Sequence, residues 1–217
     1  MAGRACVRLV DVLGRVVATL VDTRHTCATI AEDRHVTKNR KVALIRGINV
    51  GRAKRVAMSE LKALIEDFGY TEVRTLLNSG NVVFTAPKDT SGEIAARIEK
   101  ALVLRLDVDA RVVVLTAAEI AKMMDENPLL DRADNHSKLH VAVPLRAADL
   151  PRLEPLSTQD WEEDAFALGK HAAYLWCAEG MTESRLPQAV GRALKDAVTM
   201  RNWATMLKIN ELLAAEG

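Results

Sequence analysis

The chain has 217 residues, enough for one large domain or two small ones with a sizeable core. Hydrophobic residues make up 49% and charged residues 27%, as in ordinary globular proteins, and the net charge of +1 gives no basic field that would bind nucleic acid nonspecifically. Aromatic residues make up only 4%, which leaves few platforms on which bases could stack.

Neither a membrane span nor a signal peptide is visible in the sequence. The apolar runs fall short of the roughly 18 residues needed to cross a bilayer, and charged residues interrupt the N-terminal apolar pieces. Cys6, Cys27 and Cys177 have no metal-ligand spacing, and they favour a reducing compartment over a disulfide scaffold. We therefore expect a cytoplasmic protein with no membrane partner.

Residues 1–40 differ from the rest of the chain. Residues 7–20 are compatible with a β-hairpin turned near Leu13 and Gly14, and residues 21–40 are polar without a pattern. Two interpretations stay open: an appendage packed loosely on the main domain, or an upstream extension of a native chain that begins near Val36. We assign this segment no function.

The next segment, 41–115, has a regular pattern that predicts the element order β-α-β-β-α-β. Strands are expected at 41–45, 73–77, 82–85 and 111–115. One helix is expected from Met58, with Ser59 near its start and Gly69 at its end, and the other follows a capping box of Thr90 and Glu93. This order is that of the ferredoxin-like unit, with two helices on one face of an antiparallel sheet.

The remaining segment, 116–217, is expected to form a less regular α+β lobe. A capping box of Thr116 and Glu119 opens a helix, and a strand at 138–143, a hairpin at 165–177 and two closing helices follow, the last of them starting near Thr199. The predicted fold class is therefore α+β with two lobes, 41–115 and 116–217, preceded by the extension 1–40.

A glycine-spaced loop after the first core strand is the strongest candidate for a binding site. Its glycines let the backbone approach a ligand, and its N–H groups together with basic side chains at Arg52, Lys54 and Arg55 suit a phosphate or a carboxylate. A hairpin turn at 78–81 and the cation and amide of Arg201 and Asn202 are expected to contribute. The predicted ligand-binding residues are Arg46, Gly47, Asn49, Gly51, Asn78, Ser79, Asn81, Arg201 and Asn202.

Plainer roles for these residues remain open. The known phosphate-loop patterns are absent, so the glycines are also compatible with a simple tight turn. The hairpin turn can satisfy its own backbone. A cation at a helix start is unfavourable for the helix dipole, so Arg201 is expected to have a specific partner, for which a structural carboxylate competes with a ligand.

Neither a metal site nor a cofactor is predicted. On an extended segment, His136 and His140 would lie roughly 13 Å apart, too far to share one ion, and only His171 could join them. The sequence contains none of the familiar nucleophile motifs and no diagnostic carboxylate pair, so whether the protein is an enzyme stays open.

Three stretches resemble a widespread bacterial family known only as domain of unknown function 1697. They are 42–51, which includes Arg46-Gly47-Ile48-Asn49-Val50-Gly51, 73–84, which includes Ser79-Gly80-Asn81, and 199–205, which includes Arg201-Asn202-Trp203. The resemblance runs from Lys41 to about Leu213 and leaves out residues 1–40, which favours the late start. The chain departs from the family pattern at Arg52, where a second glycine is usual, at Asn78 and at Arg185. The resemblance implies a two-lobed α+β fold and brings no established activity.

Three hypotheses for the function remain. The first is a protein that binds a small anionic ligand, phosphate or nucleotide-like, at the loop after the first core strand. The second is a single-stranded nucleic-acid binding module that uses the sheet and Phe84, which the near-zero charge makes unlikely. The third is an assembly or interaction protein without catalysis, whose second lobe supplies a dimer surface formed by Trp161, Trp176, Trp203 and the Met-bearing helices, with core placement of these residues as the competing interpretation. The oligomeric state is not predicted.

Overall fold

The computed structural model describes residues 9–10, 16–17, 39–49, 55–86 and 89–215. The chain forms two compact units, Met1–Val36 and Thr37–Gly217. In the first unit, β1 (Leu9–Val10) pairs in antiparallel fashion with β2 (Val16–Val17), as the predicted hairpin requires. The predicted turn of this hairpin and the polar stretch after it lie outside the described residues.

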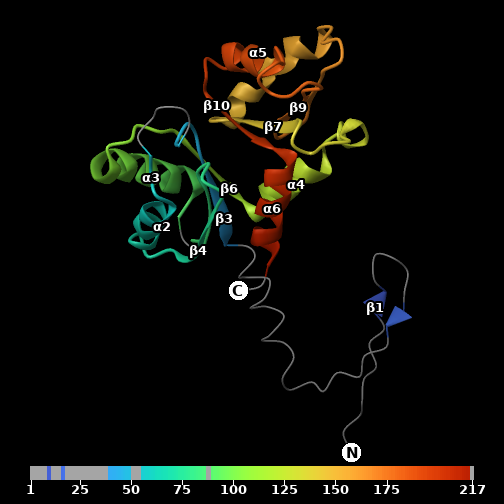
Figure 1. Cartoon of the computed structure of the whole chain (residues 1–217). Coiled ribbons are helices and arrows are strands. Elements are labelled where there is room, and N and C mark those ends of the chain that lie inside the picture. Colours follow the sequence, from blue (N-terminus) through green and yellow to red (C-terminus); the bar gives the residue numbers. More distant parts are fainter. Residues whose placement is uncertain (1–8, 11–15, 18–38, 50–54, 87–88, 216–217) are drawn as a thin grey trace, which may run out of the picture. The chain divides into compact units, whose positions relative to one another are not determined.

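The second unit begins with an antiparallel sheet in the strand order β4-β5-β3-β6. The helices α2 and α3 cover one face of this sheet and bury a core with it (Figure 1). The element order is the one predicted, with ends that differ by one or two residues. In chain order the elements are β3 (Arg40–Ile45), α2 (Met58–Glu66), β4 (Thr71–Leu76), β5 (Asn81–Thr85), α3 (Ser91–Leu106) and β6 (Val112–Thr116).

A second antiparallel sheet follows, in the strand order β10-β7-β9-β8. Its elements, with two 3₁₀ segments η1 and η2, are α4 (Ala117–Asp125), η1 (Leu130–Arg132), β7 (Leu139–Pro144), η2 (Ala147–Thr158), β8 (Ala165–Leu168), β9 (Ala173–Trp176), α5 (Leu186–Ala193), β10 (Val198–Asn202) and α6 (Trp203–Ala214). The mixed α+β fold class is thereby confirmed. The ferredoxin-like assignment of the first half and the division near Thr116 stay predictions.

The helix starts follow local chemistry. Both predicted capping boxes form: Thr116 N donates to Glu119 Oε2 at 2.8 Å, and Thr90 N donates to Glu93 Oε2 at 2.9 Å. At α2, however, Ser59 does not cap the helix. Ala57 is the N-cap residue, and its N–H donates to the side chain of Glu60 at 3.2 Å.

The prediction that the last helix starts near Thr199 is wrong. Residues 198–202 form strand β10, which pairs with β7 so that Arg201 lies opposite Val141. Helix α6 begins only at Trp203, and Asn202 caps it by accepting a hydrogen bond from Thr205 N at 2.9 Å. The strand is not predicted from the sequence because its backbone hydrogen bonds go to β7, which lies far away in the sequence.

Helices α4 and α6 lie between the two sheets (Figure 1) and share one core with both of them. Val42, Leu44 and Val83 point into this core from the first sheet, and Tyr174 points into it from the second. A third core lies under α5 and η2 on the other face of the second sheet. Both faces of the first sheet are therefore covered. None of the helices in the described part of the chain is long and apolar enough to cross a membrane.

Candidate functional site

Arg201 reaches from β10 in the second sheet to the end of β3 and the β4–β5 hairpin in the first. Its Nε donates to Asn81 Oδ1 at 2.5 Å, and its Nη2 donates to the carbonyl oxygens of Ile45 at 2.9 Å and Ser79 at 3.1 Å. Its Nη1 donates to Thr199 Oγ1 at 2.9 Å and to the Met200 carbonyl at 2.8 Å. All five N–H donors of the guanidinium therefore meet acceptors, and each acceptor is neutral.

The charge of Arg201 is partly desolvated. Burial lowers the pKa of Arg201 to about 10, so the side chain is still protonated at neutral pH. No carboxylate is among its hydrogen-bond partners in the described part of the chain. The guanidinium thus joins the two sheets and leaves a net positive charge at their junction.

The loop after β3 is held against the β4–β5 hairpin by Asn49. This residue has a left-handed backbone (φ 59°), and its side-chain amide donates to the carbonyls of Val56 at 2.9 Å and Asn78 at 3.0 Å. Its Oδ1 accepts from Val56 N at 2.7 Å. The fully buried Asn81 secures the hairpin from within by donating to Leu76 O at 3.0 Å. These amides therefore serve the loop and the hairpin themselves.

A pocket of about 480 Å³ opens between this loop, α5 and β10. Arg46 lies at its rim, where Nη2 is 3.5 Å from Asp196 Oδ1, and both side chains are substantially exposed. Such surface ion pairs contribute little to stability and exchange readily. The pocket is lined by Arg46, Gly47, Met181, Pro187, Gly191, Asp196, Val198, Thr199, Met200 and Arg201.

The predicted binding residues thus divide into three groups. Arg46, Gly47 and Arg201 line one pocket. Asn49, Asn78, Ser79 and Asn81 belong to the contacts that hold the loop and hairpin behind it, and Asn202 caps α6. Gly51, like Arg52 and Lys54, lies outside the described residues.

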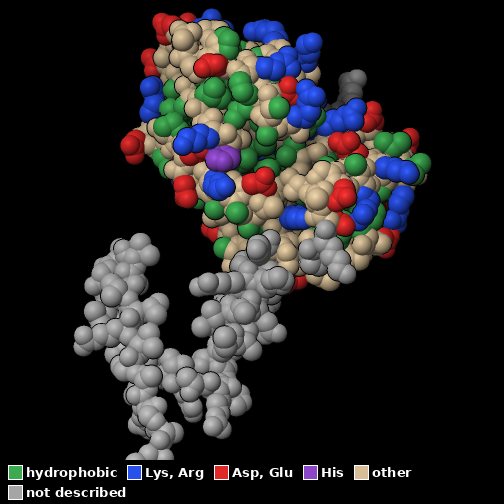
Figure 2. Space-filling model, turned by 180° about the vertical axis from the view of Figure 1, so that it is seen from behind, with side chains coloured by type: hydrophobic (Ala, Val, Ile, Leu, Met, Phe, Trp, Pro, Cys, Tyr) green, Lys and Arg blue, Asp and Glu red, His purple; other side chains and the backbone are tan. Residues whose placement is uncertain are grey.

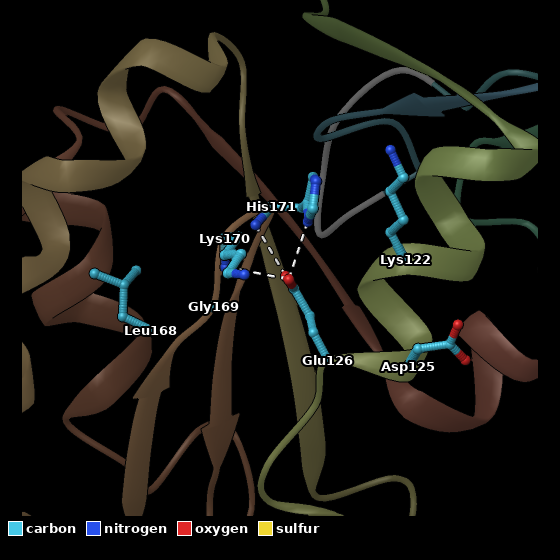
Figure 3. Close-up of a pocket in the computed structure, with 7 residues that line it drawn as sticks. All are labelled: Lys122, Asp125, Glu126, Leu168, Gly169, Lys170 and His171. Carbon is cyan, nitrogen blue, oxygen red and sulfur yellow. Dashed lines mark hydrogen bonds and ion pairs between the residues drawn. The ribbon is translucent and has the colours of Figure 1, made fainter.

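A second and larger pocket, of about 670 Å³, lies between α4 and the β8–β9 hairpin (Figure 3). At its centre the carboxylate of Glu126 accepts hydrogen bonds from the backbone N–H groups of Lys170 at 3.2 Å and His171 at 2.9 Å. It also lies 3.0 Å from Tyr174 Oη, whose single hydrogen it shares with the Met123 carbonyl at 2.7 Å, and it contacts His171 Nδ1 at 2.9 Å. The lining residues are Lys122, Asp125, Glu126, Leu168, Gly169, Lys170 and His171.

The hydrogen bonds to Glu126 favour its ionised form. Burial alone would raise the pKa of Glu126, but the donors from His171, Tyr174 and Lys170 outweigh burial and hold this pKa below its ordinary value. An ionised carboxylate only accepts hydrogen bonds, so Nδ1 of His171 carries a hydrogen. In the neutral ring, Nε2 is then the unprotonated nitrogen.

The histidine on strand β7 has a structural environment. His140 is buried, its Nδ1 lies 3.1 Å from the Lys138 carbonyl, and burial lowers its pKa. Within the described residues, no group of three or more His, Cys, Asp or Glu side chains is arranged to hold a metal ion.

Comparison with known proteins identifies the family. The family described as "Protein of unknown function (DUF1697)" matches residues 38–174. The chain belongs to this family. The match spans the loop after β3 and the β4–β5 hairpin, which confirms the resemblance of those motifs, and it ends before the third motif at 199–205. None of the curated proteins compared with the chain matches it.

A solved structure with a similar fold is that of the conserved bacterial protein SP0830 from Streptococcus pneumoniae. It is similar with a TM-score of 0.67 and 20% sequence identity, over 80% of this chain and 98% of that one. At this identity the likeness shows a shared fold, and the family itself comes with no assigned function.

In this DUF1697 chain, replacement of Glu126 by glutamine tests the charge of the partly buried carboxylate. At neutral pH we expect a loss of about 1–3 kcal/mol in the free energy of unfolding, because four donors lose a charged acceptor. A carboxyl group with a depressed pKa stabilises the fold above its unfolded-state pKa, and this stabilisation is lost as the pH falls through the folded-state value. The difference between wild type and variant should therefore shrink below pH 4.5, the ordinary value.

Urea denaturation across this pH range measures the effect. Glu162→Gln is the matched control, because the Glu162 side chain forms an exposed ion pair with Arg185. A difference that stays constant down to strongly acid pH would contradict the assignment of an ionised Glu126.

Proposed function

We propose that the protein is cytoplasmic and binds a small anionic ligand, phosphate or nucleotide-like, in the pocket of Arg46, Gly47 and Arg201. The observation that carries the proposal is the charge of Arg201, which is largely buried in the pocket wall and surrounded by neutral acceptors. A charge in such a place is screened less than a surface charge, and so it attracts an anion more strongly.

Each of the three residues has a distinct role in this proposal. Arg201 supplies charge without a direct hydrogen bond, because its donors are engaged within the protein. Arg46 supplies the direct contact by exchanging its long ion pair with Asp196 for the ligand. Gly47 has a φ of +76°, and a Cβ built there would meet nothing within 4 Å, so the backbone is open to a ligand on this side.

The size of the pocket also supports a small ligand. A volume of about 480 Å³ lies in the range of sites for small molecules, about 300–1,000 Å³. The buried free thiol of Cys177 agrees with a reducing compartment, and so with the cytoplasm.

Thermal unfolding in the presence of phosphate, sulfate and a nucleoside monophosphate tests the proposal. A ligand present at ten times its Kd stabilises the fold by about 1.4 kcal/mol, which corresponds to about 3–6 °C in Tm for a chain of this size. We expect a rise of this order at about 10 mM for a ligand with a Kd near 1 mM, and its loss in Arg46→Gln.

Arg185→Gln is the control, because Arg185 is an exposed arginine whose partner is Glu162. Sodium chloride at equal ionic strength separates specific binding from screening. The proposal would be ruled out if the three ligands raised Tm no more than sodium chloride does. It would also be ruled out if Arg46→Gln and Arg185→Gln lost the rise in Tm equally.

The two other functions have less support. Phe84 is fully buried and Figure 2 shows acidic and basic side chains interspersed over one face, so a base-stacking sheet and a large basic surface are not favoured. Trp176 and Trp203 are buried in the core and are not available for an assembly surface.

A further inference from the structure

The pocket around Glu126 and His171 has a chemistry different from that of the anion pocket. We propose that it is a second site, in which Nε2 of His171 accepts a proton from a bound small molecule that carries a carboxylate or phosphate group. In this site Glu126 is a positioning residue, and Lys122 and Lys170 attract the anionic group. The proposal is independent of the function proposed for Arg46 and Arg201.

The first support is the way in which His171 is fixed. The two oxygens of one carboxylate hold both its backbone and its ring: Glu126 Oε1 accepts from His171 N, and Oε2 accepts from Nδ1, each at 2.9 Å. Glu126 is itself fixed by Tyr174 Oη and by the N–H of Lys170. The ring therefore has a set orientation and a set tautomer, as a proton acceptor requires.

The second support is accessibility. The side chain of His171 is 35% exposed and that of Glu126 is 19% exposed, so the imidazole faces the pocket and the carboxylate stands behind it. In Figure 3 the side chain of Lys122 extends toward the same end of the pocket as the His171 ring. A ligand that reaches the ring therefore comes near an ammonium group.

The third support is an apolar pocket next to His171. His171 and Lys170 also line a narrower, mostly apolar pocket of about 210 Å³, which continues to β6 and η2 and contains Val143 and Leu150. A ligand can place its apolar part there and its anionic group by the lysines. The charged residues that line these two pockets together with His171 are Glu119, Lys122, Asp125, Glu126 and Lys170, and in Figure 3 the carboxylate of Asp125 points away from the His171 ring.

The proton transfer balances without a further reactant. An O–H bond of the ligand breaks, its electron pair stays on the ligand oxygen, and a new N–H bond forms at Nε2. The imidazolium is stabilised by Glu126, and the new negative charge on the ligand is stabilised by the lysines. Return of the proton restores the starting state.

The first experiment determines the tautomer of His171 by ¹⁵N NMR of the imidazole rings in the full chain. Wild type should show Nδ1–H and an unprotonated Nε2 for His171, and the exposed His136 should show a mixture of tautomers. Glu126→Gln should move His171 toward that mixture, which a purely structural role would not require. A mixed or Nε2–H tautomer in wild type would overturn the proposal.

The second experiment uses 4-hydroxy-3-nitrobenzoate, a carboxylate whose phenol turns yellow when it loses its proton. A neighbouring cation lowers the pKa of an acid by about one unit or more, so binding should raise the ratio of phenolate to phenol about tenfold at a fixed, mildly acid pH. The rise should disappear in His171→Gln and need higher probe concentrations in Lys122→Gln, but persist in His136→Gln.

The Arg46→Gln variant separates the two sites. If the colour change persists in Arg46→Gln and is lost in His171→Gln, the second site is supported, whatever becomes of the anion pocket. If the change is lost in Arg46→Gln and kept in His171→Gln, the probe binds at the anion pocket and the second site is rejected. No colour change in wild type at millimolar probe also rejects it.

Discussion

Replacing Arg201 by methionine is expected to lower the free energy of unfolding by about 2–4 kcal/mol. The change removes five hydrogen bonds and leaves the buried Asn81 amide and the Ile45 carbonyl without their donors. Methionine also removes the cost of keeping a charged guanidinium partly desolvated. The expected loss is therefore smaller than the summed free energies of the five hydrogen bonds. Because the guanidinium connects β10 to β3 and the β4–β5 hairpin, the variant should also loosen the junction of the two sheets.

Urea denaturation of the Arg201→Met variant measures this loss. Arg201→Lys should give an intermediate value, since an ammonium has three donors instead of five and no planar fork. Arg185→Met should cost about 0–1 kcal/mol, because its ion pair with Glu162 is exposed. If Arg201→Met proved as stable as Arg185→Met, the guanidinium would not join the sheets in the way described.

Replacing Gly80 by alanine is expected to destabilise the protein by about 2–4 kcal/mol, for two separable reasons. Its φ of +74° is in the left-handed region, which costs an L-residue about 1–2 kcal/mol. In addition, the new Cβ would lie 2.9 Å from Ile48 Cδ1 and 3.0 Å from Ile45 Cβ. The hairpin would therefore be forced away from the loop after β3.

Gly69→Ala isolates the backbone part of this cost. Gly69 has nearly the same φ, +79°, but a Cβ there meets nothing within 4 Å. We expect about 1–2 kcal/mol for Gly69→Ala and a clearly larger loss for Gly80→Ala. Equal losses of stability in the two variants would show that a Cβ at position 80 causes no clash between the hairpin and the loop after β3.

Phosphate binding should weaken in Gly80→Ala alone if the loop forms the anion pocket.

The parts of the fold that the sequence predicts best are those specified by local chemistry. The capping residues Thr90 and Thr116 mark the starts of α3 and α4, and alternating or helical spacing of apolar residues marks most of the other elements. Strand β10 is different, since only Val198 and Thr199 favour strands, and Met200, Arg201 and Asn202 do not. Its pairing with β7 supplies what local propensity lacks.

The candidate sites likewise contain some features that local sequence predicts and others that depend on residues far away in the sequence. Glycine spacing marks the loop of Gly47. The sequence predicts a partner for Arg201 because a helix is expected to start there, but Arg201 lies in strand β10, and its partners are backbone carbonyls, the Asn81 amide oxygen and the Thr199 hydroxyl. The pairing of Glu126 with His171 could not be predicted, because the two lie 45 positions apart and neither belongs to a recognisable motif. Gly169 is the one local sign: a Cβ there would lie 2.6 Å from Glu126 Oε1, so the turn needs glycine to admit the carboxylate.

The position of α6 has a consequence for the order in which the protein matures during synthesis. This helix is made after every strand, yet it covers Val42, Leu44 and Val83 on the first sheet. A nascent chain that already contains both sheets therefore still exposes an apolar surface, the kind of surface that chaperones recognise and that leads to aggregation. The first sheet acquires its final protection only when residues 203–214 have left the ribosome.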